Sequence, residues 1–149
     1  MTLPVHLTFS YLKRTLLFRF EAGTSRGVMH TRDVFWIKVH RIGDLDQVGW
    51  GEAAPLIGLS PDFLPDFEEV LGKFLAQANH RSWDLEEESL LQQVKALVPF
   101  SLPSIRFGLE TALLDFLNGG RKRILSNTFF DQGVPIPING LIWMGTKEF

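Results

Sequence analysis

The stretch GWGEAAPLIGLSPD, residues 49–62, separates two parts of the chain that differ in hydrophobic period. Before it, apolar residues alternate within residues 5–20, and residues 33–40 are rich in β-branched and aromatic side chains, which predicts β-strands. From Ser60 onward apolar residues recur at helical spacing, which predicts amphipathic helices. The stretch itself begins as a strand and continues as an almost uncharged apolar loop. We therefore expect strands first and helices second.

Three strands are predicted before this loop, and we expect them to form an antiparallel meander. The first covers residues 5–20, and the second, residues 33–40, is rich in β-branched and aromatic side chains. The third covers residues 47–53 and follows a turn-forming segment. The connection at residues 21–32, EAGTSRGVMHTR, is too long and too rich in small polar residues for a tight hairpin. It is predicted to be a functional or mobile loop.

The first two predicted helices have recognisable start signals. Ser60 is a natural N-cap with Pro61 at the first helical position, and Phe67 and Leu71 lie on the predicted buried face. Asp84 is the predicted N-cap of the second helix, which continues to Val98 and has an acidic first turn. The proline that follows ends this helix.

The third predicted helix opens near residues 101–104 and closes at Asn118, with Gly119 suited to a left-handed conformation after it. Residues 134–145, VPIPINGLIWMG, are predicted to form a fully buried strand. Pro135 and Pro137 stand at its beginning, where a strand tolerates proline best.

Composition limits the possible classes of protein. Of the 149 residues 45% are hydrophobic and 21% charged, so the chain is expected to fold. A net charge of -2 gives no long-range attraction to nucleic acids or anionic membranes, and the basic run at residues 121–123 is interpreted as a solvated helix end. The absence of cysteine excludes disulfides and a cysteine nucleophile. Without a signal-like or membrane-length apolar segment, we expect a cytoplasmic protein.

The residue types that usually carry catalysis do not form a recognisable site. His6, His30, His40 and His80 show no spacing typical of metal ligands. Carboxylates concentrate at the predicted helix starts, where they complement the helix dipole. A P-loop and a G-x-S-x-G elbow are both absent from the sequence. We therefore predict neither a catalytic residue nor a metal ligand within this chain.

Four segments in the same order resemble the amino-terminal part of the enolase superfamily, in its muconate-lactonizing-like branch. The resemblance implies an α+β capping domain, a three-stranded antiparallel meander followed by helices, over the mouth of a modified (β/α) barrel. Residues 1–133 would be the cap with its joining helices, and residues 134–149 the start of a truncated barrel. The four segments are residues 21–32, 49–62, 104–119 and 136–143.

By resemblance, two loops would close over a substrate. For the loop after the third strand the alternative is ordinary packing between sheet and helix. Arg26, in the other loop, is expected either to pair with a substrate carboxylate or to be a solvated loop residue. Glu52 is expected to make a structural hydrogen bond rather than to act as an acid or base. The predicted substrate-binding residues are Thr24, Ser25, Arg26, Leu56, Ile57 and Asn139.

The resemblance also implies a metal-assisted reaction. In this branch Mg²⁺ stabilises the enolate formed when a lysine removes the proton next to a carboxylate. Those groups would lie beyond Phe149, so the chain alone is expected to bind no metal and to be inactive. The expected enzyme is a lyase that dehydrates a cyclohexadiene carboxylate in menaquinone biosynthesis. The alternatives are a dipeptide epimerase or another racemase, and a stand-alone small-molecule binding module.

The same reading gives the expected partners. They are a small-molecule carboxylate substrate, the missing barrel domain and, through an exposed apolar underside, a second copy of the chain. Nucleic acids and membranes are not expected as partners.

Overall fold

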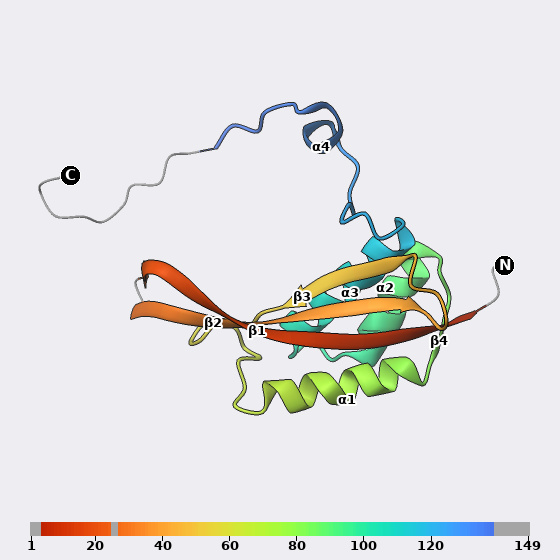
Figure 1. Ribbon diagram of the computed structural model, residues 1–149, viewed down its shortest axis with the longest axis horizontal. Helices are drawn as coiled ribbons and strands as arrows, with labels where there is room; N and C mark the ends of the chain where they lie inside the picture. Colours follow the sequence, from red (N-terminus) through yellow and green to blue (C-terminus); the bar gives the residue numbers. More distant parts are fainter. Residues whose placement is uncertain (1–3, 25–26, 139–149) are drawn as a thin grey trace, which may run out of the picture.

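A four-stranded antiparallel sheet forms the centre of the molecule (Figure 1). The computed structural model describes residues 4–24 and 27–138. The strand order is β3-β2-β1-β4, so the predicted meander of three strands is confirmed and a fourth short strand is added. The strands are β1 (Val5–Thr24), β2 (Gly27–Arg41), β3 (Val48–Ala53) and β4 (Ser82–Trp83).

The predicted loop at residues 21–32 is wrong over its described part. Strand β1 continues to Thr24 and β2 begins at Gly27, so the two strands form one long ribbon that extends beyond the helices (Figure 1). Ala22 pairs with Met29 and Thr24 with Gly27, after a shift of register that follows Leu17. Backbone pairing needs no apolar side chains, so small polar residues continue the ladder past the point where the alternating pattern ends.

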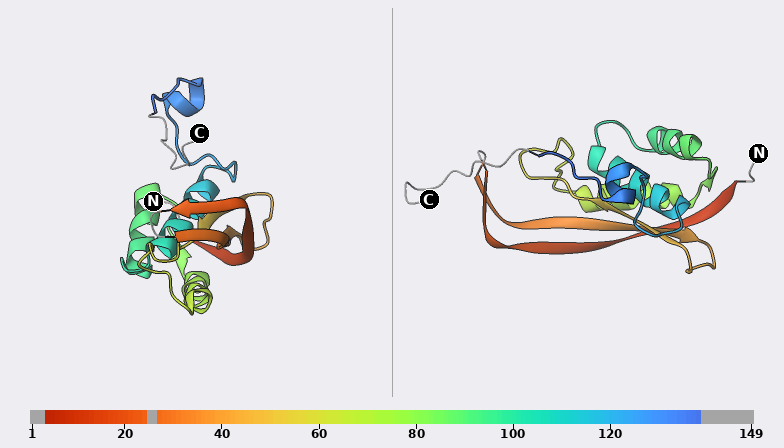
Figure 2. Two further views of the ribbon diagram at one scale, coloured as in Figure 1. Left: turned by 90° about the vertical axis from the view of Figure 1, so that its left-hand side faces the viewer. Right: turned by 90° about the horizontal axis from the view of Figure 1, so that it is seen from above.

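Helices α1 and α3 pack on one face of the sheet, and α2 packs on α3 (Figure 2). A further short helix, α4, lies in the segment that leaves this body. None of the helices in the described part of the chain is long and apolar enough to cross a membrane. The helices are α1 (Phe67–Asn79), α2 (Glu87–Leu97), α3 (Pro103–Leu117) and α4 (Thr128–Gln132).

Two predicted helix starts are wrong. Residues 61–66 are turns and irregular backbone, and α1 begins only at Phe67, since Pro65 disfavours a helical conformation for the residue before it. Helix α2 is capped by Glu86, whose carboxylate accepts from the Ser89 amide at 2.9 Å, and not by Asp84. The predicted end of α3 is confirmed, with Asn118 as C-cap and Gly119 at φ +85°.

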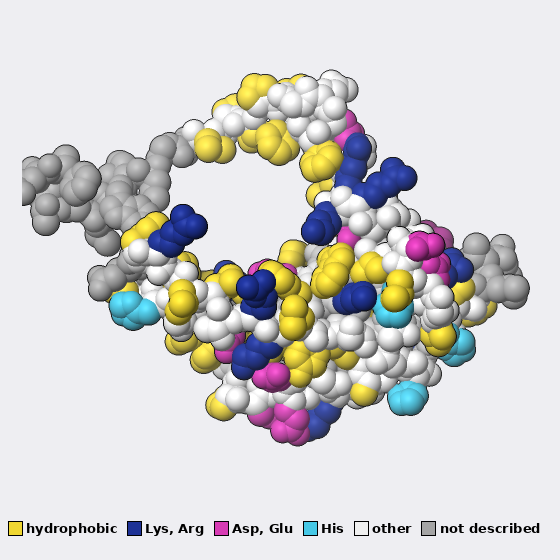
Figure 3. Space-filling model, viewed as in Figure 1, with side chains coloured by type: hydrophobic (Ala, Val, Ile, Leu, Met, Phe, Trp, Pro, Cys, Tyr) yellow, Lys and Arg dark blue, Asp and Glu magenta, His cyan; other side chains and the backbone are white. Residues whose placement is uncertain are grey.

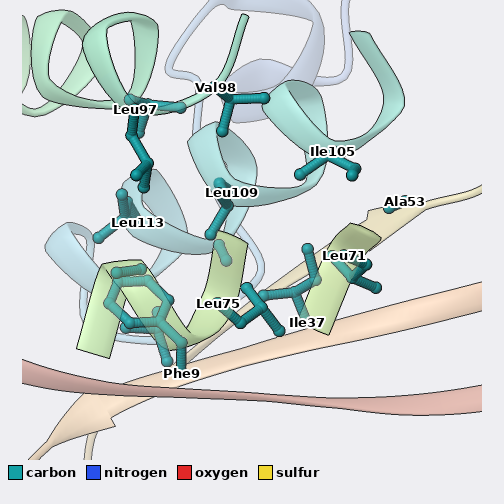
Figure 4. Packing of buried hydrophobic residues seen from close by; sticks show 14 of the residues in the cluster. Phe9, Ile37, Ala53, Leu71, Leu75, Leu97, Val98, Ile105, Leu109 and Leu113 are labelled. Atoms are coloured by element: carbon teal, nitrogen blue, oxygen red, sulfur yellow. The ribbon is translucent and has the colours of Figure 1, made fainter. Parts of the chain in front are cut away.

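The core lies between the sheet and its three helices. Strand β2 points Phe35, Ile37 and Val39 to the helical side, where each is at least 96% buried. The Phe9 ring lies 5.3 Å from that of Trp83, so β4 brings a large aromatic side chain into the core. Figure 4 labels Phe9, Ile37, Ala53, Leu71, Leu75, Leu97, Val98, Ile105, Leu109 and Leu113 of this cluster.

After Lys122, whose amide still donates to Asp115, the segment that follows α3 leaves this body (Figure 1). Residues 134–138 are exposed and belong to no strand, which contradicts the predicted buried strand over this part; its remaining residues lie outside the described ones. A strand needs a neighbour that completes its hydrogen bonds, and the two prolines supply no amide donors. We call residues 121–138 the arm, and apolar side chains gather along it (Figure 3). Those exposed are Leu125, Phe129, Phe130, Val134, Ile136 and Ile138.

Candidate functional site

A pocket of about 290 Å³ lies where β3 ends, and we call it the loop pocket. One wall is the loop with Leu56 and Ile57, and another is the base of the β1-β2 ribbon, including Met29 and Arg32. The turn before α1 closes a third side with Phe63. Leu56 is partly buried, whereas 63% of Ile57 is exposed. Two of the residues predicted to contact substrate therefore lie together at one hollow.

Of the other predicted site residues, the structure describes the backbone of Thr24. Thr24 stands at the end of β1. Ser25, Arg26 and Asn139 lie outside the described residues.

The loop is folded back by its own hydrogen bonds. The Ser60 hydroxyl accepts from the Leu56 amide at 2.9 Å, and the Ser60 amide donates to the Leu56 carbonyl at the same distance. Ser60 therefore closes a turn and does not cap a helix. Next to it, Asp62 is fully buried and accepts from the amide and hydroxyl of Ser104, at 2.7 and 2.9 Å. These bonds fix the far end of the loop to the start of α3.

Two glycines of β3, just before the loop, allow α3 to pack unusually close to this strand. A Cβ built on Gly51 would lie 2.0 Å from the Gly108 carbonyl oxygen, and one on Gly49 would lie 2.1 Å from that of Ala112. Both distances are far inside van der Waals contact, so only glycine lets α3 lie this close to β3. We call Gly49, Gly51 and Gly108 the glycine seam.

A buried carboxylate reinforces the seam. Asp115 of α3 is 99% buried, accepts from the Trp50 amide at 2.9 Å and also accepts from the Lys122 amide. Because Asp115 of α3 holds the Trp50 amide and the glycines let the same helix lie close to β3, the strand that leads into the loop pocket has a fixed position.

Charged side chains line the ribbon side of the loop pocket. Lys13 Nζ lies 3.0 Å from Glu68 Oε2 and 3.4 Å from Asp33 Oδ2. The hydroxyls of Tyr11 and Thr15 donate to Glu68 Oε1 at 3.1 Å and to Asp33 Oδ1 at 2.6 Å, respectively. The bond from Thr15 is the main reason that the pKa of Asp33 is lowered, and the bond to Glu68 is the main reason that the pKa of Lys13 is raised. Both shifts favour the charged forms, so these groups act as fixed charges near neutral pH.

Arg32 was not singled out by the sequence. Its Nη2 donates to the Ala54 carbonyl at 2.7 Å, across the gap between β2 and the loop. Its Nε is buried and has no hydrogen-bond partner among the described residues. No sequence pattern points to this role, because Arg32 falls at the end of the segment that was predicted to be a loop.

Glu52 lies on the other side of β3. Its Oε2 accepts from the Trp36 indole at 3.2 Å, which agrees with the structural hydrogen bond predicted for it. Nearby is a more open hollow of about 520 Å³ that contains none of the predicted substrate-binding residues. The described part of the chain has no group of three or more histidine, aspartate or glutamate side chains that could hold a metal ion.

Two curated relatives are similar to the chain in sequence. An o-succinylbenzoate synthase from Desulfotalea psychrophila is 32% identical over 169 aligned residues, which cover 96% of this chain and 44% of the relative. One from Edwardsiella ictaluri is 30% identical, over 68% of this chain and 28% of the relative. The chain thus spans less than half the length of the relatives it matches. No family model matches it.

Solved structures share the fold. MenC from Desulfotalea psychrophila has a TM-score of 0.69 at 24% identity, over 94% of this chain and 42% of that one. A mandelate racemase/muconate lactonizing protein from Herpetosiphon aurantiacus has a TM-score of 0.61 at 20% identity, over 78% and 32%. A dipeptide epimerase from Methylococcus capsulatus, complexed with Mg and the dipeptide L-Arg-D-Lys, has a TM-score of 0.60 at 15% identity, over 77% and 31%. The predicted α+β class is confirmed by these matches and by the sheet with its helices.

Proposed function

Since the chain belongs to the enolase superfamily and has the α+β fold of its amino-terminal capping domain, we propose that it is the substrate-specificity cap of an o-succinylbenzoate synthase. The whole enzyme would dehydrate a cyclohexadiene carboxylate to o-succinylbenzoate, a step of menaquinone biosynthesis. Sequence identity of 32% over nearly the whole chain supports this enzyme within the superfamily.

The observation that carries the proposal is the loop pocket. Its walls combine the apolar side chains of Leu56, Ile57 and Phe63 with the cation of Arg32, while Lys13 in the same wall is already paired with Asp33 and Glu68. A small organic acid presents the same combination, an apolar body and a carboxylate. In the proposed enzyme this pocket faces the barrel mouth and surrounds the part of the substrate away from the reacting carbon.

The remaining predicted contacts stay part of the proposal. Thr24, Ser25 and Arg26 at the end of the ribbon would approach the substrate from one side, and Asn139 from the start of the barrel. Residues 1–133 would form the cap with its joining helices, and residues 134–149 would begin the barrel.

The partners of the proposed cap follow from the apolar arm. The proposed main partner is a barrel domain, whose surface would cover the exposed side chains of the arm; self-association through the same side chains is the weaker alternative. The described residues offer no set of ligands for Mg²⁺, so the proposal assigns no metal to them.

A chimeric enzyme tests this function. In it, the present chain replaces the matched 44% of the Desulfotalea psychrophila relative, and the purified protein is assayed with the cyclohexadiene carboxylate and Mg²⁺. The controls are the unmodified relative and its remaining part without the replaced segment. We expect the chimera to dehydrate the substrate and the control without a cap to be inactive.

A folded chimera that epimerises dipeptides, or that acts on neither substrate class, would contradict the proposal. Folding is judged by circular dichroism and a cooperative thermal transition. The chain extended by the sequence that follows it in its own gene is assayed in parallel, because its domain contacts do not depend on a foreign barrel. Inactivity of this folded extended chain would equally overturn the proposed lyase function.

A further inference from the structure

The ladder between β2 and β3 stops before the loop pocket begins. Its last pair is Phe35 with Ala53, so no backbone pairing with β2 extends beyond Ala53. At the next residue the Arg32 guanidinium donates to the Ala54 carbonyl at 2.7 Å. This side-chain bond takes the place of one further rung and ties the start of the loop to β2.

The charges around the loop pocket are unevenly paired. Asp33 and Glu68, the carboxylates that line it, both lie within 3.4 Å of Lys13 and accept hydroxyl hydrogen bonds as well. Arg32 forms no ion pair with any described residue, and its Nε lacks a partner. Lys13 is therefore shared by two carboxylates, whereas the guanidinium of Arg32, on β2 beside the start of the loop, is a pocket cation that no described carboxylate pairs with.

A guanidinium supplies more than a backbone tether needs. One neutral donor would be enough to hold the Ala54 carbonyl, and the half-buried Arg32 in addition places its Nε, a buried donor atom without a partner, at a cost in stability. Unpaired buried donors in a folded protein call for a specific explanation, and one such explanation is a ligand that completes the arrangement.

We infer that Arg32 is a positioning residue of the proposed cap: it holds the loop with Leu56 and Ile57 in place, and its guanidinium, which is in no ion pair with a described residue, attracts an anionic substrate to the pocket. This inference rests on the proposed function for its second half only. The first half, the tether, concerns this chain alone and can be tested on it.

Hydrogen exchange on the chain tests the tether. The informative amides are those of Leu56, Leu59 and Ser60, which are bonded within the loop. In Arg32→Gln we expect them to exchange about tenfold faster, because a hydrogen bond from a charged donor is lost. In Arg32→Lys, which keeps a long cationic donor, the acceleration should be smaller. Amides in the middle of α3 should not change.

Arg14→Gln is the matched control. Arg14 belongs to β1, and its guanidinium lies 5.2 Å from the Trp36 ring and does not line the loop pocket. Its replacement should leave loop exchange unchanged. Unaltered loop exchange in Arg32→Gln, or equal acceleration in the loop and in α3, would overturn the tether.

Kinetics of the active chimera test whether the charge of Arg32 favours binding of the anionic substrate. We expect Arg32→Gln to raise KM several-fold and to change kcat less than twofold, which is the pattern of a loss of binding shared by ground and transition states. Added NaCl should raise KM more steeply in the parent chimera and in Arg32→Lys than in Arg32→Gln, because salt screens the missing charge. An unchanged KM in Arg32→Gln, or the same dependence of KM on NaCl in all three proteins, would contradict an electrostatic role of Arg32 in substrate binding.

The two failures are distinguishable. If the parent chimera and the extended chain are inactive, the proposed function fails and exchange of the loop amides still decides the tether. If the enzymes are active and the Arg32 variants behave as the parent does, the inference fails and the proposed function stands.

Discussion

The glycine seam and the loop pocket are built on the same strand and differ most in how closely the molecule packs there. Along the seam, β3 and α3 approach so closely that no Cβ fits on Gly49 or Gly51. A few residues further on, the chain leaves a hollow of about 290 Å³ with an exposed Ile57 at its edge. The contrast teaches that a tightly held strand can present a loop in a defined position while the tip of the loop stays available for contact.

The largest effect should come from filling the seam. Gly51→Ala places a methyl group 2.0 Å from a backbone oxygen, so the helix must shift, and we expect a loss of about 3 kcal/mol or more in the free energy of unfolding. Urea denaturation measures it. The matched control is Gly72→Ala in α1, where nothing lies within 4 Å and alanine should add about 0.5–1 kcal/mol. Equal stabilities of the two variants would show that the space at Gly51 is no tighter than at Gly72 in α1.

The next largest effect should come from the buried acid behind the seam. Asp115→Ala leaves the Trp50 and Lys122 amides without their acceptor, and we expect a loss of about 2–3 kcal/mol in the free energy of unfolding. Asp115→Asn keeps one acceptor oxygen and should lose less. An unchanged urea midpoint in Asp115→Ala would show that Asp115 does not hold the strand.

On the pocket side, a smaller and pH-dependent effect is expected at Asp33. Because the Thr15 hydroxyl bond lowers the pKa of Asp33, folding is stabilised above the ordinary carboxyl pKa, and this contribution is lost as the pH falls through the lower folded value. Asp33 is 46% exposed, so solvent screening limits the contribution to about 0.5 kcal/mol.

Nuclear magnetic resonance titration of Asp33 between about pH 2 and pH 6 checks this, a range that brackets the usual carboxyl pKa. In Thr15→Val the pKa of Asp33 should rise toward its usual value. A titration curve that is the same in both proteins would mean that the hydroxyl does not stabilise the carboxylate.

The smallest effect on stability should come from the loop itself. Ile57 is 63% exposed, so Ile57→Ala should change the free energy of unfolding by no more than about 0.5 kcal/mol while raising KM of the chimera. Ile42→Ala is the control, since Ile42 is 68% exposed and does not line the loop pocket. It should leave both quantities unchanged. A fall in stability without a change in KM would make the loop a packing element.

The sequence was most informative where one local signal decides the structure. Alternation of apolar residues predicted the paired strands, and Asn118 followed by Gly119 marked the end of α3. The sequence was least informative where contacts with a distant part of the chain determine the local structure. The length of the ribbon depends on backbone pairing that side chains do not signal, and the short strand β4 exists because Trp83 fits the core beside Phe9.

In the candidate site, too, the features that depend on tertiary contacts could not be predicted from the sequence. Leu56 and Ile57 were predicted as substrate contacts from the family resemblance of their loop, and the structure places both at the loop pocket. Arg32 was missed because its significance comes from the Ala54 carbonyl, which lies 22 positions away in the chain. The two glycines of β3 were visible in the sequence, but their reason, the close approach of α3, appears only when the helix is placed on the sheet.

A crystal structure of the active chimera with o-succinylbenzoate bound would show where the product lies relative to the cap. We expect product atoms in contact with Leu56 and Ile57, at carbon-to-carbon distances of about 4 Å, with the Arg32 to Ala54 bond in place. Product bound entirely by the barrel, with no atom in contact with either side chain, would contradict this expectation.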